Sequence, residues 1–129
     1  MNDGKHVILY IDDDQDMLDA VRMILGANGY EMVEAHSAEE GLRKYRESTP
    51  DFMLVDLMME EVDSGINFAK EMKVLGNTIP LFLLSSVGDS LDDNTDYKTL
   101  GLDGVFQKPI HPKTLLSILK KKLGQISTS

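Results

Sequence analysis

The chain has 129 residues, a formal net charge of −9 and no cysteine, which suits a single domain and excludes disulfides, thiolate zinc sites and cysteine nucleophiles. The negative charge argues against nucleic-acid binding by this domain and favours a basic partner or cations. No apolar run approaches the ~20 residues that cross a bilayer and no secretory signal is visible, so we expect a cytoplasmic protein that does not bind membranes.

An apolar strand that runs directly into three carboxylates begins the predicted fold. Residues 6–11 form a nearly continuous apolar run, which is typical of a strand buried on both faces, and Asp12, Asp13 and Asp14 follow it. Adjacent carboxylates repel one another, so they favour solvent or a shared cation. The carboxyl end of a buried parallel strand is also where open α/β sheets bind their ligands.

Helical and strand patterns alternate through the next part of the chain. Apolar residues at helical spacing follow the carboxylates as far as a stop signal at Asn28–Gly29, and residues 30–35 predict a second strand. Ser37 and Glu40 form a capping box that opens another helix. Thr49–Pro50 ends that helix, because a residue before proline disfavours the helical conformation.

The remaining predicted elements continue this alternation. They are a strand over 52–55, a loop over 57–64, a helix after Gly65, a strand over 81–84, a weakly anchored helix over 89–100, a strand over 105–107 and a helix from Pro112 to Leu123. We therefore expect one domain over residues 5–124 and a disordered or frayed tail over 125–129. The pattern predicts a doubly wound, flavodoxin-like α/β fold with a five-stranded parallel sheet of order 2-1-3-4-5 and helices on both faces.

The predicted strand ends bring chemically different side chains to one edge of the sheet. Asp12 and Asp13 follow the first strand, Asp56 the third, Ser85 the fourth and Lys108 the fifth. Carboxylates without nitrogen or sulfur ligands suit a hard divalent ion, and Mg²⁺ fits best. A hydroxyl and an ammonium beside them would stabilise phosphoryl oxygens, and the third-strand aspartate could itself act as a nucleophile and form an aspartyl phosphate.

Other candidate residues have simpler interpretations. Asp14 suits the positive end of the first helix better than a metal site. His6, His36 and His111 are scattered along the chain, which favours surface or capping roles over metal binding.

The chain resembles the receiver domains of two-component response regulators. The residues that carry the resemblance are Ile11-Asp12-Asp13-Asp14, Leu54 to Met59, Leu84-Ser85-Ser86 and Gln107-Lys108-Pro109-Ile110. Each motif is short, but the set in this order and spacing is specific, and the resemblance covers residues 5–123. It implies a phosphorylation-switched signalling domain that catalyses only transfer onto itself and its own slow dephosphorylation, and is not an enzyme in the usual sense.

The resemblance also implies a role for each site residue. Asp56 would accept a phosphoryl group from a phosphohistidine on a sensor histidine kinase or phosphotransfer protein. Mg²⁺ would be bound by Asp13, Asp56 and the backbone carbonyl of Met58, with Asp12 acting through water. Ser85 would bond the phosphoryl group and Lys108 would pair with it, and the Lys108–Pro109 peptide is typically cis.

The output side is less defined by the resemblance. The usual output face comprises the segment 89–100, the strand 105–107 and the last helix, and we expect partner contacts or a homodimer there. The sequence names neither the kinase nor a downstream effector or fused output domain.

Several positions depart from the usual receiver pattern. Glu60 stands where a proline is usual, and one extra residue precedes Gly65. Val105 replaces an aromatic switch residue, and strand alternation should point the neighbouring Phe106 to the other face. Met58 and Val87 are apolar where polar side chains can orient a hydrolytic water, which predicts slow self-dephosphorylation.

Three alternatives remain beside the phosphorylated receiver. The altered loop and Val105 leave open a receiver-like interaction module that no longer takes phosphate. A Mg²⁺-dependent phosphohydrolase would need an acid/base aspartate two residues after its nucleophile, where this chain has Met58. A flavodoxin-type FMN carrier would need a Ser/Thr-rich phosphate loop after the first strand, where this chain has aspartates.

Overall fold

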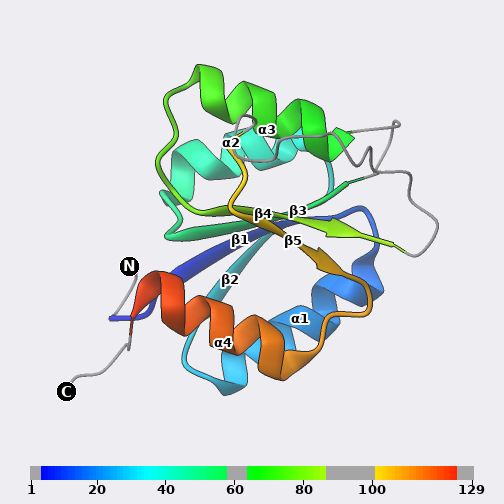
Figure 1. Cartoon of the computed structure of the whole chain (residues 1–129), viewed down its shortest axis with the longest axis vertical. Coiled ribbons are helices and arrows are strands. Elements are labelled where there is room, and N and C mark those ends of the chain that lie inside the picture. Colours follow the sequence, from blue (N-terminus) through cyan, green and yellow to red (C-terminus); the bar gives the residue numbers. More distant parts are fainter. Residues whose placement is uncertain (1–3, 58–63, 87–100, 125–129) are drawn as a thin grey trace.

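The computed structural model describes residues 4–57, 64–86 and 101–124, and strands and helices alternate in it from residue 7 to residue 85 (Figure 1). The elements are β1 (Val7–Ile11), α1 (Gln15–Ala27), β2 (Glu31–Ala35), α2 (Ala38–Ser48), β3 (Phe52–Asp56), α3 (Ser64–Val74), β4 (Leu81–Ser85), β5 (Gly104–Gln107) and α4 (Pro112–Leu123). The predicted helix over 89–100 and the predicted tail over 125–129 lie outside the described residues.

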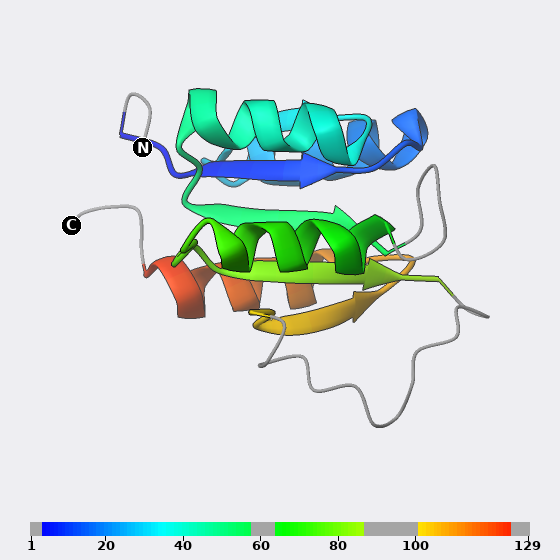
Figure 2. The same cartoon turned by 90° about the horizontal axis from the view of Figure 1, so that it is seen from above.

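The sheet is parallel and has the predicted strand order, β2-β1-β3-β4-β5. Its strands run in the same direction, so their carboxyl ends share one edge (Figure 2). The chain order reverses between β1 and β3, which pair directly, with Ile11 opposite Val55. This reversal creates the crevice in which doubly wound sheets bind their ligands.

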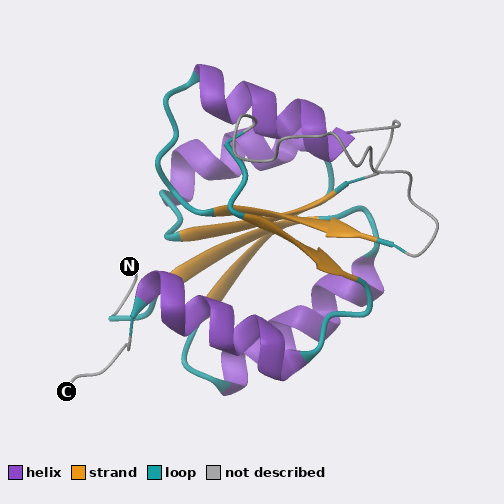
Figure 3. Ribbon diagram, viewed as in Figure 1, coloured by secondary structure: helices purple, strands orange, loops and turns teal. Residues whose placement is uncertain are grey.

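Helices cover both faces of the sheet and form three layers (Figure 3). One face packs against α1 and α4, through side chains such as Leu18 and Leu115, and the other packs against α2 and α3, through side chains such as Leu42 and Phe68. The central strands β1, β3 and β4 are buried throughout, which explains why they read as continuous apolar runs. No helix within the described ranges combines the length and apolar character that crossing a bilayer requires.

Side-chain caps begin two of the helices as the sequence predicts. The carboxylate of Asp14 accepts from the backbone N–H groups of Asp16 and Met17, so Asp14 is the N-cap of α1. The hydroxyl of Ser37 accepts from the N–H of Glu40 at 3.1 Å and caps α2. The other half of the predicted capping box differs, because the Glu40 carboxylate accepts from the N–H of His36.

The end of α2 differs from its predicted geometry. Thr49 has a left-handed backbone, with φ of 43°, although the residue before a proline favours an extended one. Its N–H bonds to the carbonyl of Tyr45 and so satisfies an acceptor of the last turn. The prediction that the helix ends here is confirmed, but a left-handed cap ends it and not an extended pre-proline residue.

Candidate functional site

Three carboxylates converge where β1 and β3 end. Asp12 and Asp13 follow β1, and Asp56 is the last residue of β3, one position beyond the predicted strand end. One carboxylate oxygen from each lies within 4.8 Å of the others. Asp12 and Asp56 are buried, whereas Asp13 is exposed, so the group opens to solvent on the side of Asp13.

The carboxylate of Asp12 is held by several donors inside the protein. Its Oδ1 accepts from the backbone N–H of Asp14 at 2.9 Å, and its Oδ2 accepts from the hydroxyl of Tyr10 at 2.5 Å. The ammonium of Lys108 lies 3.2 Å from the same Oδ2. A buried charge is tolerated only when it is paired and hydrogen-bonded, and Asp12 meets that condition with 0% exposure.

Lys108 connects the carboxylates of neighbouring strands. Its Nζ lies 3.4 Å from Oδ1 of Asp56 as well as close to Asp12. Its backbone N–H donates to the carbonyl of Ser85 at 2.8 Å, which ties the end of β5 to the end of β4. The Lys108–Pro109 peptide is cis, as the resemblance implies.

The electrostatics of the group leave negative charge in excess. Burial, followed by the charge of Asp12, raises the pKa of Asp56 to about 7, although Lys108 opposes the shift. Burial lowers the pKa of Lys108, but the charges of Asp12 and Asp56 outweigh burial and the net pKa is raised. One ammonium therefore does not neutralise three clustered carboxylates, which favours binding of a further cation.

The donor set fits a hard divalent cation such as Mg²⁺. It consists of carboxylate oxygens, with no thiolate in the chain and no imidazole in this group. Asp13 is exposed, which suits an ion that keeps several of its waters. Asp12, Asp13 and Asp56 are thus the described residues that could hold the ion.

The start of α3 approaches the end of β3 closely. A Cβ built on Gly65 would lie 2.6 Å from the backbone oxygen of Asp56 and 2.8 Å from Cα of Leu57. The N–H of Gly65 also donates to the carbonyl of Leu57 at 2.8 Å. Glycine at position 65 lets the start of α3 contact the backbone of Asp56. The extra residue inferred from the sequence comes before Gly65 in the chain.

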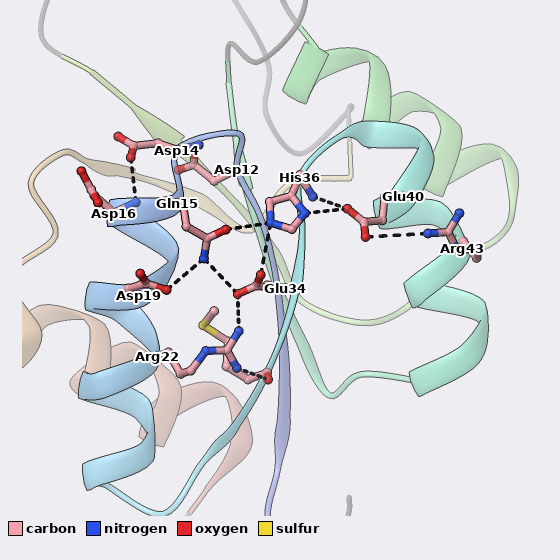
Figure 4. Close-up of polar contacts among 11 residues, drawn as sticks. Asp12, Asp14, Gln15, Asp16, Asp19, Arg22, Glu34, His36, Glu40 and Arg43 are labelled. Atoms are coloured by element: carbon pink, nitrogen blue, oxygen red, sulfur yellow. Dashed lines mark hydrogen bonds and ion pairs between the residues drawn. The ribbon is translucent and has the colours of Figure 1, made fainter.

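A polar network borders this edge of the sheet (Figure 4). The Nε2 atom of His36 lies 2.9 Å from Oε1 of Gln15 and 3.1 Å from Oε2 of Glu34. Its Nδ1 atom lies 3.0 Å from Oε1 of Glu40. Glu40 also accepts from the backbone N–H of His36 at 2.6 Å, and this bond is the main reason that the pKa of Glu40 is lowered. His36 thus links side chains of α1, β2 and α2, which is a structural role.

Most residues that the sequence places at the site are found together. Asp12, Asp13, Asp56 and Lys108 form one connected group. Ser85 is buried at the end of β4 and joins the group through its backbone. The carbonyl of Met58, a predicted metal ligand, lies outside the described residues.

Sequence reasoning did not identify Tyr10 as part of the site. It lies inside the apolar run that predicts β1, and it is a core residue with 0% exposure. The available signal was its spacing, because residues two apart on a strand share a face and Tyr10 precedes Asp12 by two. Val105 and Phe106 do follow the predicted alternation: Phe106 packs on the core with α1 and α4, and Val105 on the opposite core.

Comparison with known proteins identifies the family. A model of the response regulator receiver domain matches residues 8–120. The chain belongs to the receiver-domain family of response regulators. It is therefore a signalling domain of two-component systems, which act through phosphorylation, and not an enzyme in the usual sense.

Individual relatives agree with this assignment. The receiver domain is 32% identical over 122 residues to the phosphate regulon transcriptional regulatory protein PhoB of Escherichia coli, covering 93% of this chain and 52% of PhoB. It is 28% identical over 116 residues to the response regulator MprA of Mycobacterium ulcerans, covering 90% of this chain and 49% of MprA. The chain thus spans about half the length of these relatives.

Solved structures show the same fold. A CheY-like receiver domain protein from Methanospirillum hungatei has a TM-score of 0.83 at 28% identity, covering 95% of this chain and 96% of the other. The chemotaxis response regulator CheY4 of Vibrio cholerae has a TM-score of 0.77 at 28% identity, covering 91% of this chain and 98% of the other. Receiver domains bind Mg²⁺ at an acidic cluster, and the grouping of Asp12, Asp13 and Asp56 corresponds to such a cluster.

Proposed function

We propose that this receiver domain accepts a phosphoryl group on Asp56 from a phosphohistidine of a sensor histidine kinase or phosphotransfer protein. The observation that carries the proposal is the position of the Asp56 carboxylate, which is grouped with the carboxylates of Asp12 and Asp13 and lies 3.4 Å from the Lys108 ammonium. A carboxylate oxygen of Asp56 attacks phosphorus, a P–O bond forms, and the P–N bond to the donor imidazole breaks. The product is an aspartyl phosphate, and the electron pair of the broken bond returns to the imidazole.

The other residues take complementary roles in this proposal. Asp13, Asp56 and the carbonyl of Met58 hold Mg²⁺, with Asp12 acting through water. When bound, the ion neutralises negative charge on the transferred group. Lys108 pairs with a phosphoryl oxygen, which its placement beside Oδ1 of Asp56 supports. Ser85 donates its hydroxyl to another phosphoryl oxygen, and its burial at the neighbouring strand end supports that role.

Phosphorylation changes the surface through which this domain contacts its partners. We assign partner contacts, or a homodimer, to β5, α4 and the segment 89–100. A cytoplasmic location, a single domain over residues 5–124 and the lack of nucleic-acid binding by this domain belong to the same proposal. The matched PhoB is a transcriptional regulatory protein, and this chain covers only about half of it.

The proposal is tested by amide NMR spectra recorded with Mg²⁺ and beryllofluoride, which mimics an acyl phosphate. We expect shifts around Asp56 and on β5 and α4 in the wild type, and their loss in Asp56→Asn. Asp51→Asn is the control for removal of a negative charge outside the carboxylate group. No response in the wild type would favour an interaction module that takes no phosphate, and steady phosphate release from a small phosphodonor would favour a hydrolase.

A further inference from the structure

The hydroxyl of Tyr10 is directed at the carboxylate group from inside the core. Tyr10 lies in the middle of β1 and is wholly buried, and its side chain packs in the core cluster that includes Leu18 and Leu54. Its hydroxyl donates to Oδ2 of Asp12 at 2.5 Å. A phenylalanine would supply nearly the same apolar contact, so the contribution specific to tyrosine is this one hydrogen bond.

The bond acts on an oxygen that is shared. Oδ2 of Asp12 also lies 3.2 Å from Nζ of Lys108, and that same Nζ lies 3.4 Å from Oδ1 of Asp56. Oδ1 of Asp12 is held separately by the N–H of Asp14 at 2.9 Å. Donors on both oxygens restrict the Asp12 carboxylate to one orientation. The hydroxyl of Tyr10 is a neutral donor to Oδ2, so it weakens the electrostatic attraction between Asp12 and Lys108.

We propose that Tyr10 is a positioning residue for Mg²⁺ binding, acting through Asp12. Its hydroxyl fixes the Asp12 carboxylate toward the ion and leaves Lys108 shared between Asp12 and Asp56. This inference rests on the proposed function, because it assumes that the carboxylate group holds Mg²⁺. Groups that orient metal ligands are commonly worth ~10- to 100-fold in metal affinity, and the lower end of that range applies here because Asp12 acts through water.

The test is the Mg²⁺ dissociation constant of Tyr10→Phe, measured by amide NMR titration. We expect it to rise about 10-fold relative to the wild type. Tyr30→Phe is the matched control, because Tyr30 belongs to the same core cluster but sits before β2, at the opposite end of the strands from the site. We expect that variant to keep wild-type affinity. Urea unfolding of each variant gives the free energy of unfolding, so that titrations are compared on folded protein.

A second pair of variants separates positioning from a general effect on the fold. In an Asp12→Asn background, the change Tyr10→Phe should leave the Mg²⁺ dissociation constant unaltered, because the oxygen that it orients is no longer a carboxylate. The same fold-loss in both backgrounds would overturn the inference, as would unchanged affinity in Tyr10→Phe alone. If Tyr10→Phe has no effect while Asp13→Asn weakens Mg²⁺ binding, the inference fails and the proposed function stands. If the wild type shows no Mg²⁺-dependent shifts, both fail.

Discussion

Asp56 shows how burial and neighbouring charge combine at a single residue. It is 5% exposed, faces Asp12 and Asp13, and has Lys108 as its cationic partner. Its pKa is raised from 3.8 to about 7, so the folded protein binds a proton more tightly than the unfolded chain does. Without Mg²⁺, this group therefore contributes stability at acidic pH that is lost as the pH rises through about 7.

Asp56→Asn should consequently stabilise the metal-free protein at high pH. We expect the gain in free energy of unfolding over the wild type to grow between pH 4 and 7 and to level off on the order of 1–3 kcal/mol above that. Urea unfolding at a series of pH values, in buffer with EDTA, measures it. Asp19→Asn, an exposed site on α1, controls for net charge. A gain in the free energy of unfolding that does not vary with pH would show that burial and neighbouring charges do not raise the pKa of Asp56.

Met58 sets a second expectation at the residue scale. Its side chain is apolar where receiver domains can carry a polar group that orients the hydrolytic water. Met58→Asn should therefore shorten the lifetime of the aspartyl phosphate, by about 10-fold if a positioned polar group assists attack by water. Phosphate release from phosphorylated protein measures the rate, with Met58→Leu as the apolar control. Equal rates in the wild type and both variants would contradict the expectation.

At the scale of elements, the contact between α3 and β3 determines where Asp56 lies. Gly65 stands where a Cβ would come within 2.6 Å of the Asp56 carbonyl oxygen, and backbone atoms there have little room to move. The start of α3 and the backbone of Asp56 are therefore in direct contact. Any side chain at this position must displace the end of β3 or the first turn of α3.

Gly65→Ala should lower both stability and phosphorylation. We expect a loss of about 1–3 kcal/mol in the free energy of unfolding, as for other overpacked sites, and slower labelling of Asp56 by a small phosphodonor. Gly26→Ala is the matched control, because a Cβ on that α1 glycine meets nothing within 4 Å and alanine favours helix. That variant should gain about 0.5–1 kcal/mol. If both alanines have the same effect, close packing at Gly65 is not the cause.

The elements also show what local sequence can and cannot predict. Strands β1, β3 and β4 were predictable because both of their faces are buried, and Asp14 and Ser37 because a cap acts on its own helix. The left-handed Thr49 was not, since the residue before a proline favours an extended backbone. The side chain of Glu40 accepts from the N–H of His36, whose ring also contacts Gln15 and Glu34 from other elements, and local sequence does not show these contacts.

At the scale of the molecule, the site follows from topology. The strand order reverses between β1 and β3, so Asp12 and Asp56, distant in sequence, become neighbours at one edge of the sheet. Lys108 reaches them because β5 ends at the same edge, beside β4 and Ser85. The sequence could predict that these residues meet, because each follows a strand and the strand ends share one edge. It did not predict the bond from Tyr10 to Asp12, because that bond forms through side-chain packing within the core.

The central claim is that Asp56 is the phosphoacceptor in a Mg²⁺-dependent reaction. Intact-protein mass spectrometry after incubation with acetyl phosphate tests it most directly. The account predicts a mass increase of one phosphoryl group in the wild type with Mg²⁺, and none when EDTA is present or when Asp56 is replaced by Asn. Asp51→Asn should still be labelled. Labelling of Asp56→Asn equal to that of the wild type, or labelling that does not depend on Mg²⁺, would contradict the account.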